Sequence, residues 1–124
     1  MAHILIIEDD ALIAKLLRTR LEHRGYIVSW VSDGNQALAR ALVVVPDVIL
    51  LDVTLPGMNG FALLHHLKHH RVTHAIPILM VTAQVDGRSV IAGIDGGADA
   101  YLSKPIDFSG LVSRVEACLT HRAG

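Results

Sequence analysis

The stretch from Asp47 to Gly60 constrains the fold of this chain more than any other. Its aliphatic run, residues 48–51, is bounded by polar and turn residues and does not alternate polar with apolar positions. Such a run is typical of a strand buried on both faces of a parallel sheet. Asp52 follows the run directly. We therefore expect this carboxylate at the carboxyl end of the strand, the edge where open α/β sheets hold their sites.

The rest of the apolar pattern predicts four more strands and five helices. Short runs of aliphatic or β-forming residues indicate strands at 4–7, 26–31, 76–81 and 99–103. Helical spacing of apolar residues indicates the helices, of which the stretch 86–94 is the weakest. The predicted inner faces of the other four are Leu12, Ile13, Leu16, Leu17 and Leu21; Ala37, Leu38, Ala41 and Leu42; Phe61, Leu64 and Leu67; and Leu111, Val112, Val115 and Leu119.

Strands and helices thus alternate five times, in a (βα)5 pattern. Strands separated by helices imply right-handed parallel crossovers. The predicted fold class is α/β: a doubly wound, five-stranded parallel sheet with the flavodoxin-like strand order 2-1-3-4-5. In that order the first and third strands are neighbours.

Composition fits one domain over residues 1–124 and limits its partners. A length of 124 residues with 52% hydrophobic residues supports a single sizeable core. The net charge of −1, with no cluster of Lys and Arg, makes direct binding to nucleic acid or to an anionic membrane unexpected. Cys118 is the only cysteine, and no apolar run has signal or membrane-spanning length. A cytoplasmic location is therefore predicted.

The predicted strand order brings acids together. Glu8 and Asp9 follow the first strand and Asp52 follows the third, so the three carboxylates should converge. Two carboxylates about 4 Å apart repel by about 4 kcal/mol at an effective dielectric near 20. A hard divalent cation would relieve this repulsion. An all-oxygen site favours Mg²⁺, with Mn²⁺ as an alternative, and no Cys/His spacing suits a structural zinc.

Two further groups are predicted at the same edge. Thr82 ends the fourth strand and places a hydroxyl there, and Lys104 ends the fifth and adds an ammonium group. A carboxylate nucleophile, a magnesium ion, a lysine and a hydroxyl donor together supply what phosphoryl transfer to Asp52 needs. The sequence therefore predicts a phosphoryl-accepting site.

Five spaced motifs carry a family resemblance. They are Glu8-Asp9, Asp52 with Pro56-Gly57-Met58-Asn59-Gly60, Thr82-Ala83, Tyr101, and Lys104-Pro105. Over essentially its full length the chain closely resembles the response-regulator receiver domains of two-component signalling. The resemblance implies a phosphorylation-dependent switch that receives its phosphoryl group from a histidine kinase or a histidine phosphotransfer protein. It implies self-catalysed phosphorylation and dephosphorylation rather than an enzyme acting on other substrates.

The resemblance also implies roles for the matched residues. Asp52 is the implied phosphoacceptor. The implied Mg²⁺ ligands are Asp9, Asp52, the Thr54 carbonyl and, through water, Glu8. The implied contacts of the phosphoryl group are Thr82, Ala83 and Lys104.

Signal output and phosphoryl lifetime are also assigned by resemblance. Thr82 and Tyr101 are the implied switch pair, and the bond between Lys104 and Pro105 is expected to be cis. Thr54 and Gln84 are the implied modulators of dephosphorylation. The downstream protein target is expected on the face formed by 86–94, 99–103 and 111–119.

Other classes share parts of this pattern. A flavodoxin-like FMN carrier would need a Gly- and hydroxyl-rich phosphate loop after the first strand, where Glu8 and Asp9 stand. An aspartate-nucleophile phosphatase usually carries a second acid two residues after its nucleophile, where this chain has Thr54. An interaction domain that is never phosphorylated is disfavoured because the primary family positions are all present. A receiver cut from a larger response regulator or hybrid kinase stays an alternative.

Three features favour ordinary structural roles. Asp10 is interpreted as the N-cap of the first helix. The residues His65, His66, His69 and His70 have metal-binding i, i+4 spacing, but Leu64 and Leu67 already mark the buried side, which favours a solvated face. Trp30 is interpreted as a packing residue.

Overall fold

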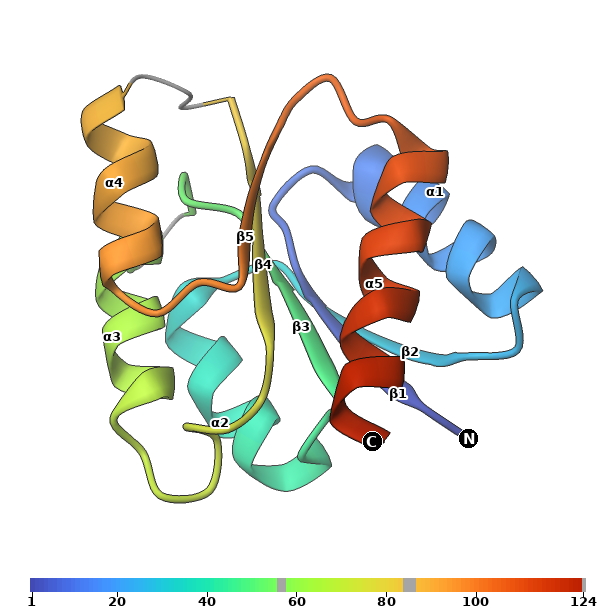
Figure 1. Cartoon of the computed structure of the whole chain (residues 1–124), viewed down its shortest axis with the longest axis horizontal. Helices are drawn as coiled ribbons and strands as arrows, with labels where there is room; N and C mark the ends of the chain where they lie inside the picture. Colours follow the sequence, from blue (N-terminus) through green and yellow to red (C-terminus); the bar gives the residue numbers. More distant parts are fainter. Residues whose placement is uncertain (56–57, 84–86, 124) are drawn as a thin grey trace.

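The computed structural model describes residues 1–55, 58–83 and 87–123, and within them strands and helices alternate along the chain (Figure 1). The elements are β1 (His3–Ile7), α1 (Ala11–His23), β2 (Ile27–Val31), α2 (Gly34–Val44), β3 (Val48–Leu51), α3 (Gly60–Lys68), β4 (Ile78–Thr82), α4 (Gly87–Asp95), β5 (Ala100–Ser103) and α5 (Phe108–Ala123). In the described residues no helix combines the length and the apolar character needed to cross a bilayer.

The sheet has the predicted order, β2-β1-β3-β4-β5, and all of its strand pairs are parallel. The last residues of β1 and β3, Ile7 and Leu51, stand opposite each other. Residues that directly follow these two strands are therefore neighbours in space. The predicted α/β class, the (βα)5 pattern and the neighbouring first and third strands are confirmed.

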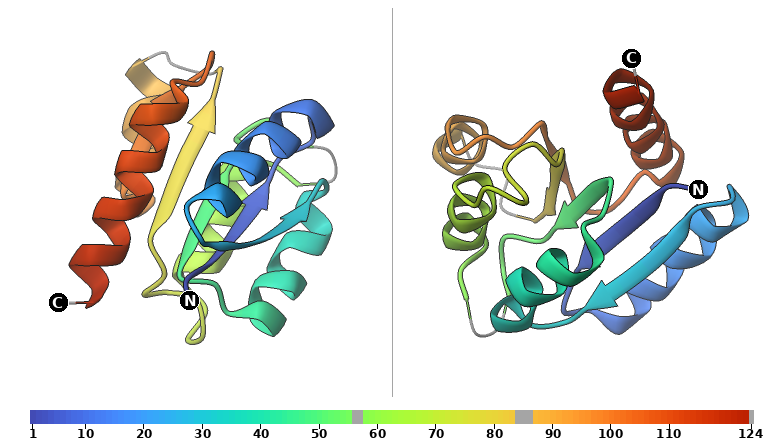
Figure 2. Two further views of the ribbon diagram at one scale, coloured as in Figure 1. Left: turned by 90° about the vertical axis from the view of Figure 1, so that its right-hand side faces the viewer. Right: turned by 90° about the horizontal axis from the view of Figure 1, so that it is seen from below.

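Helices cover both faces of the sheet (Figure 2). On one face α2 and α3 pack against inward side chains such as Leu5, Ile49 and Met80, with α4 on the same side (Figure 1). On the other face α1 and α5 pack against Ile4, Leu50 and neighbouring residues. Because both faces are covered, the three central strands β1, β3 and β4 are buried almost throughout, as their unbroken aliphatic runs predicted.

The inner face of α1 differs from the prediction. Leu12 and Leu16 are 66% and 45% exposed, whereas Ala14, Leu17 and Leu21 are buried. The small Ala14 side chain lets the helix approach the sheet closely, and this stripe leaves Leu12 and Leu16 on the solvent side. A similar shift adds Leu63 to the buried face of α3.

Strand ends differ from the prediction by one or two residues. β4 begins at Ile78 rather than at residue 76, since Pro77 has no backbone N–H to donate to the sheet. It extends to Thr82. β2 and β5 each begin one residue later than expected.

Capping fixes the start of α1 as predicted. Asp10 is its N-cap, and Oδ1 of Asp10 accepts hydrogen bonds from the backbone N–H groups of Leu12 and Ile13 at 2.9 and 3.2 Å. Three of the four predicted solvated histidines, His65, His66 and His69, are exposed on α3 and at its end, whereas His70 is half-buried and its Nδ1 accepts a hydrogen bond from the Val72 N–H at 3.0 Å. The rings of His65 and His69 stack with centroids 4.0 Å apart.

Gly60 starts α3 at a point where no side chain fits. A Cβ there would overlap Val53 Cα and lie 2.7 Å from the backbone oxygen of Asp52. The N–H of Gly60 donates to the Val53 carbonyl at 2.9 Å. The glycine therefore lets α3 begin directly against the segment that follows Asp52.

Gly60→Ala is expected to lower the free energy of unfolding by about 2 kcal/mol, because the added methyl meets backbone that cannot move aside. The matched control is Gly87→Ala, which also alters the first residue of a helix but has open space around the new Cβ. Denaturant unfolding should show a loss for Gly60→Ala and no loss for Gly87→Ala. Equal stability of the two variants would contradict this account.

Candidate functional site

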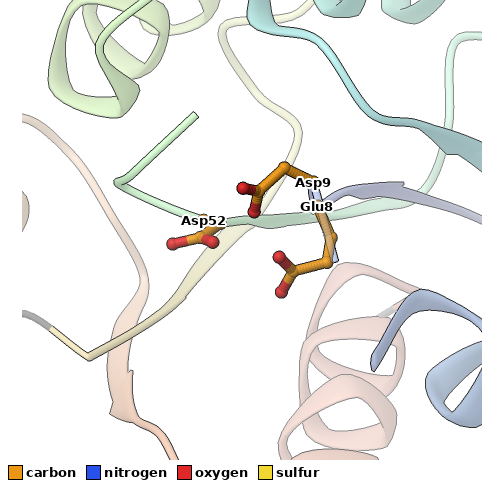
Figure 3. Close-up of side chains that lie close together, drawn as sticks. All are labelled: Glu8, Asp9 and Asp52. Atoms are coloured by element: carbon orange, nitrogen blue, oxygen red, sulfur yellow. The ribbon is translucent and has the colours of Figure 1, made fainter. Parts of the chain in front are cut away.

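Three carboxylates meet at the carboxyl ends of β1 and β3. Strand pairing continues one residue past each end, since Asp52 N–H donates to the Ile7 carbonyl at 3.0 Å and Glu8 N–H donates to the Val31 carbonyl at 3.1 Å. Oxygen atoms of Glu8, Asp9 and Asp52 all lie within 4.8 Å of one another (Figure 3). Glu8 and Asp52 are 3% and 4% exposed, whereas Asp9 is exposed. The neighbouring strands thus bring together acids that are 44 positions apart.

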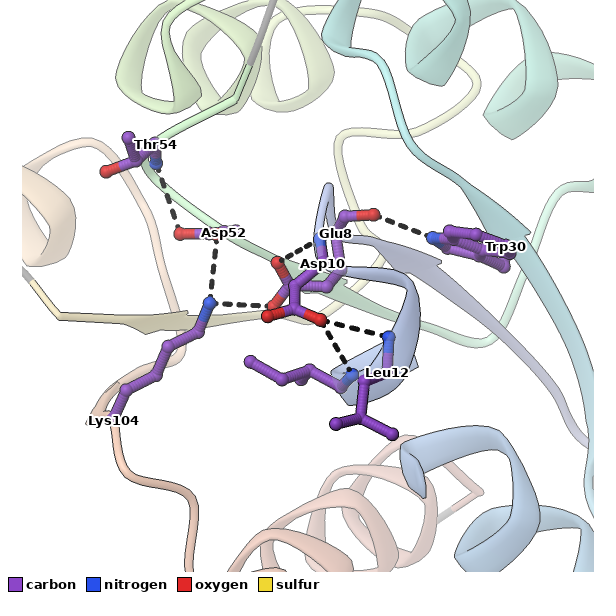
Figure 4. Close-up of polar contacts among 8 residues, drawn as sticks. Glu8, Asp10, Leu12, Trp30, Asp52, Thr54 and Lys104 are labelled. Carbon is purple, nitrogen blue, oxygen red and sulfur yellow. Dashed lines mark hydrogen bonds and ion pairs between the residues drawn. The ribbon is translucent and has the colours of Figure 1, made fainter. Parts of the chain in front are cut away.

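Lys104 reaches this cluster from the end of β5. Its Nζ lies 2.8 Å from Glu8 Oε1 and 3.0 Å from Asp52 Oδ2 (Figure 4). The backbone N–H of Lys104 donates to the Thr82 carbonyl at 2.9 Å, and the peptide bond between Lys104 and Pro105 is cis. One ammonium group therefore contacts two of the three acids.

The second oxygen of Asp52 is also engaged. Asp52 Oδ1 accepts a hydrogen bond from the backbone N–H of Thr54 at 3.1 Å. Thr54 itself is exposed in the loop after β3. The two oxygens of this carboxylate are thus oriented by different partners, one by a main-chain amide and the other by Lys104.

The remaining predicted residues follow the neighbouring strands. Thr82 is fully buried at the end of β4, and exposed Ala83 follows it. Tyr101 is half-buried in β5, and its ring lies against Gly93 of α4, where an added Cβ would come within 2.6 Å of Tyr101 Cδ2. Gln84, as well as Pro56 and Gly57 of the sequence motif, lies outside the described residues.

Burial sets the protonation of the cluster. It raises the pKa of Glu8 to about 7, with Asp9 and Asp52 adding to the rise and with Lys104 and the Asp10 N–H offsetting part of it. Burial alone would lower the pKa of Lys104, but its hydrogen bonds to Glu8 and Asp52 outweigh this effect and raise it. The lysine therefore stays charged while Glu8 titrates near neutral pH.

The raised pKa of Glu8 predicts a specific pH dependence of stability without metal. Between pH 4.5 and about 7 the folded protein keeps a proton on Glu8 that the unfolded chain has released. The free energy of unfolding contributed by Glu8 should therefore fall as pH rises through this window, by up to about 3 kcal/mol. Denaturant unfolding of wild type and Glu8→Gln in EDTA should isolate the effect, because glutamine does not titrate. Identical pH profiles for the two proteins would contradict it.

The donor set fits a hard divalent cation. Glu8, Asp9 and Asp52 offer only oxygen, the ligand type that Mg²⁺ prefers, and exposed Asp9 leaves one side of the cluster open to solvent. Among the ion pairs that the structure describes, Lys104 pairs with Glu8 and Asp52 but not with Asp9. The cluster therefore keeps a net negative charge that a bound metal ion would neutralise.

Sequence reasoning missed one residue at this site. The indole Nε1–H of Trp30 donates to the Glu8 carbonyl at 2.7 Å (Figure 4). The only available signal was the place of Trp30 one residue before the end of a strand that pairs with β1, and that register is not readable from the sequence.

Comparison with known proteins gives the family. The model of the response regulator receiver domain matches residues 4–116. The DNA-binding dual master transcriptional regulator RpaA of Synechocystis is 42% identical over 119 residues, which cover 96% of this chain and 49% of RpaA. The chain spans about half the length of the curated relatives it matches.

Solved structures agree with this assignment. A putative response regulator from Chloroflexus aurantiacus has a TM-score of 0.90 at 39% identity, over 96% of this chain and 98% of that one. The chemotaxis response regulator CheY4 of Vibrio cholerae has a TM-score of 0.89 at 31% identity, over 96% of this chain and 99% of that one. On the strength of its sequence, its sheet order and these relatives, the chain belongs to the response-regulator receiver domains of two-component signalling.

Proposed function

We propose that residues 1–124 form one receiver domain in which Asp52 accepts a phosphoryl group from a histidine kinase or a histidine phosphotransfer protein. The observation that carries this proposal is the buried Asp52 carboxylate, grouped with Glu8 and Asp9 and contacted by Lys104 at 3.0 Å. Membership of the receiver family supports the phosphoryl chemistry.

The proposed cofactor is Mg²⁺, with Mn²⁺ as an alternative. Asp9, Asp52 and the Thr54 carbonyl would hold it directly, and Glu8 would hold it through water. When bound, such a cation neutralises charge on the attacking carboxylate and on the phosphoryl oxygens. The all-oxygen character of the cluster supports this choice.

The chain's own groups position the transfer. A carboxylate oxygen of Asp52 forms the new bond to phosphorus as the donor's bond to phosphorus breaks and its electron pair leaves with the donor. Lys104 is proposed to balance the charge of the transferred group, and Thr82 and Ala83 to contact its oxygens. Their places at the ends of β4 and β5, beside Asp52, support these roles.

Turnover separates this proposal from its enzymatic alternative, an aspartate-nucleophile phosphatase. With a small phosphodonor and Mg²⁺, the proposed switch is labelled once per chain on Asp52 and does not hydrolyse a phosphoester repeatedly. Intact-mass measurement of the labelled protein, together with a continuous phosphate-release assay, tests both statements. Sustained multiple turnover of a small phosphoester would favour the phosphatase.

Thr82→Ala is expected to accept phosphate yet signal poorly. In the proposed switch, the Thr82 hydroxyl bonds a phosphoryl oxygen and so biases the position of Tyr101, whose ring packs against Gly93 of α4. The measurement compares partner affinity of the phosphorylated variant and wild type. Unchanged affinity in phosphorylated Thr82→Ala would contradict the switch role of this residue.

The proposed switch also needs residues that set the lifetime of the phosphoryl group and a surface that binds the downstream target. Thr54 and Gln84 are proposed to tune the attack of water on the phosphorylated aspartate. The downstream protein target is proposed to bind the face of α4, β5 and α5. RpaA is by name a DNA-binding regulator, but for these residues the net charge of −1 supports a protein target rather than nucleic acid. A cytoplasmic location stays a prediction, and a receiver within a larger response regulator or hybrid kinase is compatible with the same site.

A further inference from the structure

The turn that carries Glu8 and Asp9 is held by a side chain of the neighbouring strand. Trp30 lies on β2, the edge strand of the sheet, opposite Ile6 of β1. Trp30 as a whole is 36% exposed, yet its indole Nε1–H donates to the Glu8 carbonyl at 2.7 Å. This short bond joins the edge strand to the start of the turn that carries Glu8 and Asp9 (Figure 4).

The bond stands where the strand ladder stops. Glu8 N–H still donates to the Val31 carbonyl, which is the last regular contact between β1 and β2. In a parallel ladder the next backbone donor for the Glu8 carbonyl would come from Asp33. That residue has already left the strand and caps α2. The Trp30 indole supplies the missing donor.

Holding this carbonyl fixes the backbone of Asp9. The Glu8 carbonyl belongs to the planar peptide unit that leads into Asp9, so a bond to its oxygen sets the orientation of that whole unit. The next contacts follow at once, because Asp10 N–H donates to Glu8 Oε2 at 3.2 Å and Asp10 caps α1. The backbone of Asp9 is therefore held by hydrogen bonds on both sides, and this backbone sets the orientation of the exposed Asp9 carboxylate.

We propose that Trp30 is a positioning residue for the metal site: its indole N–H orients the Glu8–Asp9 peptide so that both carboxylates face the cation. This inference rests on the proposed Mg²⁺ site. Partners that orient metal ligands from outside the ligand set change affinity by about 10- to 100-fold when they are removed. Because Trp30 is an exposed residue of the edge strand, we expect the low end of that range.

Trp30→Phe tests the inference because it keeps an aromatic ring and removes only the N–H. It should weaken Mg²⁺ binding about tenfold, as followed by the backbone amide resonances of Asp9 and Asp10 in ¹⁵N-labelled protein. The matched control is Ile27→Ala, which alters an exposed residue of the same edge strand and should leave Mg²⁺ affinity unchanged. Equal Mg²⁺ affinity in Trp30→Phe and wild type overturns the positioning role.

A second measurement leaves Trp30 in place and stands even if Trp30→Phe fails to fold. Trp30 is the only tryptophan, so its indole ¹H–¹⁵N resonance is unique. Mg²⁺ should shift this resonance in parallel with those of Asp9 and Asp10, and Asp9→Asn should remove the shift. An indole resonance that does not move while Asp9 does overturns the inference. A wild type in which none of these resonances responds to Mg²⁺ overturns the proposed metal site instead.

Discussion

Asp52→Asn is expected to abolish acid-labile labelling by a small phosphodonor in the presence of Mg²⁺. The amide oxygen of asparagine is a far weaker nucleophile than a carboxylate and does not carry the charge that binds a hard cation. The structure adds that Asp52 is fixed through both oxygens, by Thr54 N–H at 3.1 Å and by Lys104 at 3.0 Å. The substitution should leave the fold in place, since the amide oxygen can keep one of these bonds.

The sharpest control for this loss is Asp10→Asn. It removes a neighbouring acid but keeps an N-cap, because asparagine caps helices as well as aspartate does. Intact-mass labelling with peptide mapping should give full modification of Asp10→Asn at Asp52 and none of Asp52→Asn. Undiminished labelling of Asp52→Asn would show that another group is the acceptor.

The sequence predicted the arrangement of the sheet and the place of the acids for one physical reason. Short, fully apolar runs bounded by turn residues are typical of strands covered on both faces, and alternation with helices then restricts the strand order to few solutions. Once β1 and β3 are neighbours, the residues after Ile7 and Leu51 must meet. The proximity of Glu8 and Asp52 was therefore predictable from local pattern and topology alone.

What the sequence could not give depends on exact packing. Counting apolar residues placed Leu12 and Leu16 on the inner face of α1, but the helix seats on the stripe that includes the small Ala14. The bond from Trp30 to Glu8 depends on the register of an edge strand, which apolar pattern does not set. The position of Lys104 between two carboxylates depends on the path of the loop after β5.

Removing the lysine of the charge cluster and removing its exposed acid should have opposite effects on the free energy of unfolding. Lys104 is the ammonium group that contacts buried Glu8 and Asp52, so Lys104→Met leaves two buried carboxylates without it. In EDTA at pH 8, where Glu8 is mostly ionised in wild type, this variant should lose about 3 to 4 kcal/mol of unfolding free energy. Asp9→Asn removes a repelling charge that solvent already screens, so it should gain about 1 kcal/mol under the same conditions.

Magnesium should stabilise these proteins in the opposite order, most for the variant that is least stable in EDTA. It binds the folded state preferentially, and its stabilisation grows with affinity for the site. Lys104→Met presents more uncompensated negative charge than wild type, and Asp9→Asn presents less. Denaturant melts with millimolar Mg²⁺ should therefore show the largest gain for Lys104→Met, an intermediate gain for wild type and the smallest for Asp9→Asn. Lys15→Met, at an exposed position of α1, controls for loss of a lysine and should follow wild type throughout. If Lys104→Met and Lys15→Met have the same free energy of unfolding in EDTA, then Lys104 does not neutralise these acids. If Mg²⁺ also stabilises all four proteins equally, then the cluster is not where the metal binds.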